Sequence, residues 1–173
     1  LMRDGPRMRE LMLQAFKDLG WNPPSILRTH PDRARSALAD LGGKVVGVGL
    51  IAPADPSYRD LAKGAAWVTS APFPDVMDGD IAFAALSVDP EHRRKGVGLA
   101  ITLARIEMAE VSGATRVFAS CAGGTGAMEL YIKLVFEPLL RRRSYHSNGS
   151  DMTLMCAPLP FIARTVQSPT RPA

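Results

Sequence analysis

The hydrophobic pattern along this chain changes its period several times, and each change indicates an element. Apolar residues recur at intervals of three and four over residues 7–19 and 99–111, which predicts two amphipathic helices. Gly20 and Gly113 follow them as stop signals. A third helix is expected to begin at Thr125 or Gly126. Apolar or alternating runs predict strands at residues 37–40, 44–52, 81–88, 116–121, 136–146 and 151–157.

Two glycine-containing turns connect neighbouring strands of this pattern. Gly42-Gly43 separates the first two, and Asn148-Gly149 separates the last two, so both pairs are expected to form hairpins. Residues 53–79 are rich in proline and have no regular period, apart from a short helix expected near residues 57–64. An excursion this long between strands is typically functional or mobile.

The order of these elements indicates an α/β protein with a mixed sheet. A length of 173 residues, with 46% hydrophobic and 22% charged residues, suits one domain with a substantial core. We expect this domain to span residues 1–160. Residues 161–173 are polar and contain two prolines, so we expect a flexible C-terminal tail.

A basic loop with two glycines lies between the expected strand 81–88 and the helix that follows it. Its sequence, DPEHRRKGVGLA, covers residues 89–100. Gly96 and Gly98 let the backbone approach a ligand without a Cβ clash. The first turn of the helix adds unpartnered N–H groups and the positive end of the helix dipole. These features favour binding of a phosphate or pyrophosphate, and the alternative is a basic loop that only caps a helix.

The glycine spacing matches neither a P-loop nor a dinucleotide-binding fingerprint. The run Arg93-Arg94-Lys95-Gly96-Val97-Gly98 instead resembles the Arg/Gln-x-x-Gly-x-Gly/Ala motif of the GNAT superfamily of N-acetyltransferases. Residues 127–136, AMELYIKLVF, resemble a second motif of the same superfamily, Ala-x-x-Leu-Tyr-x-Lys-x-Gly-Phe. Both motifs occur in the family's order and at the expected separation.

Two positions depart from the family pattern. The glycine that usually precedes the phenylalanine is Val135, so we expect the helix to end through a different turn geometry. The asparagine often found before the second motif is Gly124, so a side-chain contact to the cofactor would be missing.

The resemblance implies a GNAT-like acyltransferase fold, in which a mixed, mostly antiparallel sheet is flanked by helices and acetyl-CoA enters a splayed parallel strand pair. Main-chain groups near residues 86–88 would pair with pantetheine, the loop would hold the pyrophosphate, and Tyr131 would protonate the departing thiolate. The cofactor-binding residues implied are Leu86, Ser87, Val88, Arg93, Arg94, Lys95, Gly96, Val97, Gly98, Leu99, Gly124 and Tyr131.

The general base is less clear from the sequence. Many relatives carry a glutamate on the cofactor strand, where this chain has Ala82 and Phe83. Asp80 would point to the same sheet face as Ala82 and is the candidate base, acting through water; the alternative is a surface turn residue. His92 and His146 can also titrate near neutrality. Cys121 is expected to be a small buried residue rather than an acyl carrier.

Several classes of partner are not expected. Aromatic residues make up only 6% of the chain and no nucleic-acid-binding motif is present, although a net charge of +4 would help to hold an anionic cofactor. The two cysteines have no metal-ligand or disulfide spacing, and no apolar run is long enough for a membrane span. We therefore expect a cytoplasmic protein without a metal, and the resemblance allows a homodimer.

The function expected from the resemblance is acetyl transfer from acetyl-CoA to a primary amine of a small molecule, peptide or protein, by direct attack in a ternary complex. One alternative is a non-catalytic acyl-CoA sensor. Another is a longer-chain N-acyltransferase, for which Gly47, Gly49 and the long excursion would leave room. The sequence does not name the acceptor.

Overall fold

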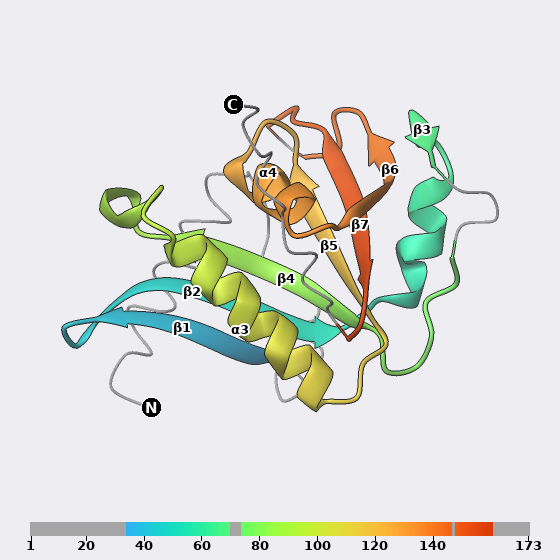
Figure 1. Ribbon diagram of the computed structural model, residues 1–173. Coiled ribbons are helices and arrows are strands. Elements are labelled where there is room, and N and C mark those ends of the chain that lie inside the picture. Colours follow the sequence, from blue (N-terminus) through green and yellow to red (C-terminus); the bar gives the residue numbers. More distant parts are fainter. Residues whose placement is uncertain (1–33, 70–73, 147, 161–173) are drawn as a thin grey trace, which may run out of the picture.

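The computed structural model describes residues 34–69, 74–146 and 148–160. In this part of the chain, a seven-stranded sheet carries two α-helices (Figure 1). The strands are β1 (Arg35–Leu41), β2 (Lys44–Pro53), β3 (Trp67–Val68), β4 (Ile81–Val88), β5 (Arg116–Ala122), β6 (Glu137–Arg142) and β7 (Met152–Pro158). The helices are α3 (Val97–Val111) and α4 (Gly126–Lys133), with short 3₁₀ turns η2 (Pro56–Ala62) and η3 (Pro90–His92).

The sheet has the order β1-β2-β4-β5-β7-β6-β3 and is mixed, as expected. Among the described strands, β4 and β5 form the only parallel pair. Their register covers only the stretch from Ile81↔Val117 to Phe83↔Ala119, although both strands continue beyond it. The two strands therefore pair at their first residues and separate afterwards, which is the expected splay.

Both helices lie on the same face of the sheet in Figure 1. Helix α3 packs across β1, β2 and β4, whereas α4 contacts β5. A core cluster under them includes Phe83, Ile106, Tyr131 and Phe136, all less than 5% exposed. This arrangement brings the start of α3 and the inner side of α4 to the place where β4 and β5 separate.

The first hairpin turns through Gly42 and Gly43, as the sequence predicts. Both glycines have positive φ, +62° and +84°, which is the conformation that a two-residue hairpin turn requires. The first strand of the second hairpin is shorter than expected. This strand, β6, ends at Arg142 instead of at residue 146, and Arg142 pairs with Met152 at the start of β7. The strands therefore end further from the Asn-Gly pair than a two-residue turn would need.

Gly47 and Gly49 do not leave room for an acyl chain, so the part of the argument for longer substrates that rests on these glycines is wrong. A Cβ on Gly47 would lie 2.6 Å from Ile101 Cδ1, and one on Gly49 would lie 2.5 Å from Ile101 Cγ2. The same Cβ on Gly49 would lie 2.8 Å from Arg105 Cδ. These glycines allow α3 to pack closely on β2, so the space is filled by the protein itself.

The exit from α4 also differs from expectation. Val135 has a φ of +64°, so it keeps the left-handed geometry that glycine would normally provide. The expectation of a different turn geometry is therefore wrong. The Phe136 amide donates to the Tyr131 carbonyl oxygen over 2.9 Å, which holds the end of α4 in this tight exit. A β-branched residue is strained in this region.

Some expectations fall on residues that the structure does not describe. The helix expected at residues 7–19 and the tail expected at 161–173 both lie outside the described residues. Within the proline-rich excursion, the expected short helix is the 3₁₀ turn η2.

Candidate active site

A cavity of about 900 Å³ opens where β4 and β5 separate. Its walls come from residues 83–88 of β4, the end of β5, the loop and first turn of α3, and the inner side of α4. Residues of the β6–β7 connection complete it. A volume of this size lies within the range of small-molecule and cofactor sites.

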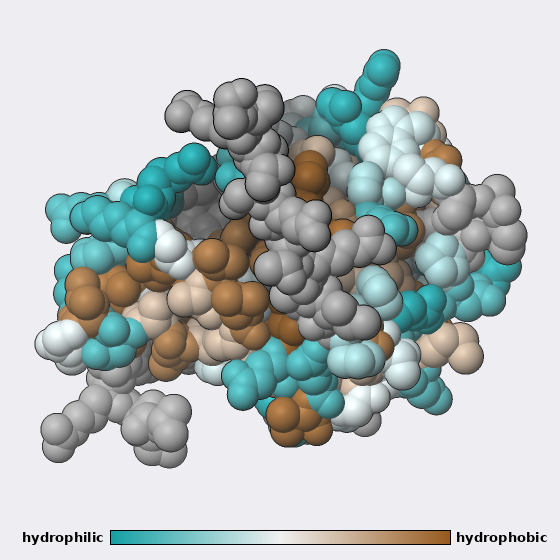
Figure 2. All heavy atoms as spheres, in the orientation of Figure 1, coloured by the Kyte–Doolittle hydropathy of each residue, from teal (hydrophilic) through white to brown (hydrophobic). Residues whose placement is uncertain are grey.

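One end of the cavity is built by the basic loop. Arg94 and Gly96 adopt positive φ values of 61° and 84°, and Gly96 is the N-cap of α3. The backbone bends here and leads into the first turn of α3. The first N–H groups of an α-helix have no partner within the helix, so an anion that binds there is stabilised. Figure 2 shows a hydrophilic surface along this loop.

The space around Gly98 indicates whether the loop end of the cavity can hold a ligand. A Cβ added there would have its nearest neighbours, Leu130 Cδ2 and Val88 Cγ2, at 3.9 Å, which is ordinary contact. No positive φ requires a glycine at this position. The protein's own packing therefore leaves room beside Gly98, and the residues present fit a pyrophosphate.

Most residues that the sequence assigns to the cofactor line this cavity. They are Leu86, Ser87, Val88, Arg93, Arg94, Gly96, Gly98, Leu99 and Tyr131. Lys95, Val97 and Gly124 are not among its lining residues. Gly124 lies in the β5–α4 loop with a φ of +74°, and its neighbour Gly123 lines the cavity instead.

The exposed edge of β4 can pair with an extended ligand. The Asp89 amide donates to the Val46 carbonyl oxygen over 2.8 Å, toward β2. Because hydrogen-bonding direction alternates along a strand, we expect the amides of Leu86 and Val88 to face the opposite side, where β5 has diverged. The Val88 carbonyl oxygen accepts from Arg93 Nε over 3.0 Å on the loop side.

Tyr131 lies deep in the site on α4 and is only 3% exposed. Its hydroxyl accepts a hydrogen bond from Arg105 Nη2 over 3.0 Å. Burial raises the pKa of Tyr131 above its usual value of 10.0, although the Arg105 guanidinium opposes this effect. The phenol therefore stays protonated at neutral pH and can act as a proton donor.

Asp80 is not brought into the cavity. Its buried carboxylate accepts hydrogen bonds from Arg116 Nη2 and Nε, at 2.5 and 3.2 Å, and from the Met77 amide at 2.8 Å. These contacts join the start of β4 to the start of β5, at the end where the two strands pair. Asp80 therefore has a structural role, and the structure does not support it as the general base.

His146 lines the cavity from the β6–β7 connection and is 4% exposed. Burial lowers the pKa of His146 below its usual value of 6.5, so the imidazole is neutral at physiological pH. A neutral imidazole can accept a proton. His146 therefore fits the role of general base better than Asp80.

Cys121 also lines the cavity, at the end of β5. Burial raises the pKa of its thiol to about 12. Because the thiolate is the nucleophilic form, Cys121 is poorly suited to carry an acyl group at neutral pH.

The sequence reasoning did not identify Arg105 and Thr102, two fully buried polar residues of α3. Both belong to the buried face of the helix together with Ile101, Ile106 and Ala109. The signal was present, because an arginine falls on the otherwise apolar side of the 3.6-residue pattern. Such a residue needs buried hydrogen-bond partners.

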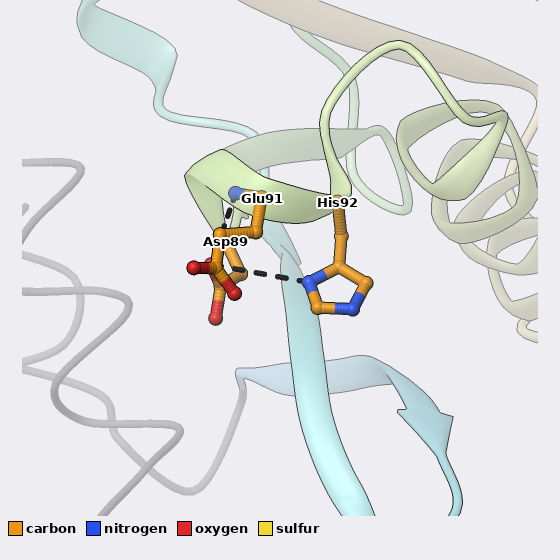
Figure 3. Close-up of side chains that lie close together, drawn as sticks. All are labelled: Asp89, Glu91 and His92. Carbon is orange, nitrogen blue, oxygen red and sulfur yellow. Dashed lines mark hydrogen bonds and ion pairs between the residues drawn. The ribbon is translucent and has the colours of Figure 1, made fainter.

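Asp89, Glu91 and His92 cluster on one side of the turn η3, just before the basic loop (Figure 3). Their ligand-type atoms lie within 4.8 Å of one another. However, Asp89 caps the turn by accepting from the Glu91 amide at 3.2 Å, and it lies 3.9 Å from both Lys44 Nζ and His92 Nδ1. These contacts favour a structural role for the cluster, as a cap of η3 that anchors the basic loop, over a metal site.

None of the helices in the described residues is both long enough and apolar enough to cross a membrane.

Comparison with known proteins identifies the family and the fold. A model of the "Acetyltransferase (GNAT) family" matches residues 6–136. A search of curated proteins found no match.

Solved structures show the same fold at low sequence identity. The protein smu.2055 from Streptococcus mutans is 19% identical, with a TM-score of 0.67 over 91% of this chain and 95% of its own. An acetyltransferase from Bacillus subtilis in complex with CoA is 17% identical, with a TM-score of 0.64 over 90% and 93%. A GNAT family acetyltransferase from Elizabethkingia anophelis with acetyl-CoA bound is 16% identical, with a TM-score of 0.61 over 87% and 90%.

The family match covers most of the chain, and the fold, the strand splay and the loop at the start of α3 agree with it. The chain therefore belongs to the GNAT family of acetyltransferases.

Proposed function

We propose that this protein transfers the acetyl group of acetyl-CoA to a primary amine by direct attack in a ternary complex. The observation that carries the proposal is the single cavity that joins the basic loop at the start of α3, the open edge of β4 and the buried hydroxyl of Tyr131. These are the three parts that binding and cleaving an acyl-CoA require.

Each part of the cavity has a role in this reaction. The amides around Gly96 and Gly98 hold the pyrophosphate, with Arg93 and Arg94 adding positive charge at the rim. The edge of β4 near Leu86 and Val88 pairs with the pantetheine arm. Acetyl-CoA supplies the thioester that the amine attacks, and a β4 amide such as that of Val88 is the candidate donor to the developing oxyanion.

Two side chains move protons. His146 accepts a proton from the acceptor ammonium, directly or through water, because its lowered pKa keeps it neutral. Tyr131 donates its proton to the departing sulfur. The buried Cys121 thiol, with its raised pKa, favours direct attack over an acyl-cysteine intermediate.

The test is release of free thiol from acetyl-CoA in the presence of pooled primary amines and peptides. Wild-type protein should release thiol with at least one pool. Tyr131→Phe should lower kcat by about 10² or more, since general acid catalysis contributes at least that much, while acetyl-CoA affinity changes little. Tight acetyl-CoA binding without thiol release from any pool would instead favour a sensor.

A further inference from the structure

Arg105 is a buried cation that pairs with none of the acidic residues in ranges 34–69, 74–146 and 148–160. It is fully buried on α3, and among the described acidic residues none forms an ion pair with it. Its Nε has no hydrogen-bond partner within the part of the chain that the structure describes. Burying an uncompensated charge is costly, so this arrangement requires a reason that packing alone does not provide.

The guanidinium sits between the strand and the helix that border the cavity. Its Nη1 donates to the Ala85 carbonyl oxygen over 2.9 Å, on β4 within the splay. Its Nη2 donates to Thr102 Oγ1 at 3.1 Å and to Tyr131 Oη at 3.0 Å. The guanidinium carbon also lies 4.1 Å from the centroid of the Phe83 ring, in a cation–π contact.

The hydrogen bond from Arg105 Nη2 to Tyr131 Oη determines the direction in which the Tyr131 hydroxyl points its proton. A guanidinium can only donate, so the hydroxyl uses a lone pair toward Arg105 and keeps its own proton for another acceptor. Within the described residues, that hydroxyl donates to no acceptor, and Tyr131 lines the cavity. Its proton is therefore available to a ligand.

A chain of hydrogen bonds connects this hydroxyl to the basic loop. Thr102 Oγ1 donates to the Gly98 carbonyl oxygen over 2.8 Å and accepts from Arg105, which donates to Tyr131. Residues 98, 102 and 105 are spaced by four and three, so they share one face of α3. Helix α3, which begins at the basic loop, therefore also positions the Tyr131 hydroxyl.

We propose that Arg105 is the positioning residue for Tyr131: it turns the hydroxyl proton into the cavity and places a positive charge behind the position where the thiolate of CoA forms. This inference rests on the proposed function and extends it to a residue outside both sequence motifs.

The amine nitrogen bonds to the carbonyl carbon, the C–S bond breaks, and its electron pair goes to sulfur. Tyr131 gives its proton to that sulfur, and Arg105 stabilises the resulting tyrosinate by its charge and hydrogen bond. The acceptor nitrogen loses two protons in total; one restores Tyr131 and the other leaves through His146 to solvent.

A double-mutant cycle separates this role from a structural one. Arg105→Met keeps an unbranched apolar stem but removes the donors and the charge. We expect it to lower kcat about tenfold or more, while KM for acetyl-CoA changes much less. In a Tyr131→Phe background, Arg105→Met should lower kcat by a clearly smaller factor, because no hydroxyl remains to be positioned and only the charge behind the thiolate is lost. Equal losses in both backgrounds would overturn the proposal.

A second measurement does not depend on turnover. The thiolate absorbance of bound CoA, followed against pH, reports the ionisation of its thiol. The thiol should ionise at lower pH on the wild-type protein than on Arg105→Met, with Arg105→Lys between them because it keeps the charge without the fork of donors. Circular dichroism confirms that each variant is folded.

The two proposals fail in different ways. If wild-type protein binds CoA but Arg105→Met changes neither the ionisation of the thiol nor kcat, only the role of Arg105 is overturned. If wild-type protein binds no CoA, the proposed function fails and the role of Arg105 fails with it.

Discussion

Val135 is strained, because a β-branched residue here has a backbone φ of +64°. Left-handed backbone costs an L-residue about 1–2 kcal/mol, and the half-exposed side chain gains little packing in return. Val135→Gly should therefore raise the free energy of unfolding by about 0.5–1 kcal/mol, after the entropy cost of glycine. Chemical denaturation measures this change.

Val135→Ala is the control for that prediction. It removes the branched side chain but keeps Cβ, so most of the left-handed strain remains. If Val135→Gly is no more stable than Val135→Ala, the left-handed geometry is not the source of strain.

Asp80 ties two elements together, since its ion pair with Arg116 joins the first residues of β4 and β5. Asp80→Asn leaves the partly buried Arg116 guanidinium without its counter-charge and should lower the free energy of unfolding by about 2–3 kcal/mol. The kcat of the folded variant should stay close to wild type, because Asp80 is outside the cavity.

Asp75→Asn provides the matched control, because it makes the same change in an exposed ion pair with Arg59. Its effect on unfolding should be below about 1 kcal/mol. A large loss of kcat in Asp80→Asn, with stability unchanged, would restore Asp80 as a catalytic candidate.

The close packing of α3 on β2 gives a second prediction about elements. Gly49→Ala places Cβ 2.5 Å from Ile101 Cγ2, so overpacking should cost about 1–3 kcal/mol of unfolding free energy. Combining it with Ile101→Ala should cost less than the sum of the two single changes, because the smaller side chain relieves the clash. Strict additivity would show that the two elements are further apart than the structure has them.

The elements were largely predictable from the sequence, whereas the polar contacts inside the site were not. Strand β4 has the bounds that its apolar run predicts, and the loop before α3 was identified from its glycine spacing. Asp80 was misjudged because alternation along a strand gives the face of a side chain but not its partner, Arg116. Arg105 meets Tyr131 only after the helices pack, 26 positions apart in the chain.

At the level of the whole molecule, the proposed mechanism combines a base on the β6–β7 connection, His146, with an acid on α4, Tyr131. The lowered pKa of His146 lies below 6.5, so kcat at saturating amine should fall as pH drops through that value and His146 becomes protonated. Tyr131, with a pKa raised above 10.0, should cause no loss of activity below about pH 10.

His146→Gln tests that assignment, because glutamine cannot titrate. Its pH profile should lose the acidic limb and its kcat should be lower throughout. An unchanged acidic limb in His146→Gln would assign the titration to another group.

The central claim is that one cavity, entered at the start of α3, binds acetyl-CoA. Calorimetric titration of acetyl-CoA into wild-type protein, Gly98→Asp and Ala100→Asp tests it most directly. Both variants add a negative charge to the first turn of α3, but only residue 98 lines the cavity. We predict binding to the wild type and to Ala100→Asp, and loss of binding in Gly98→Asp. Absence of binding to the wild type, or equal binding to all three proteins, would contradict the account.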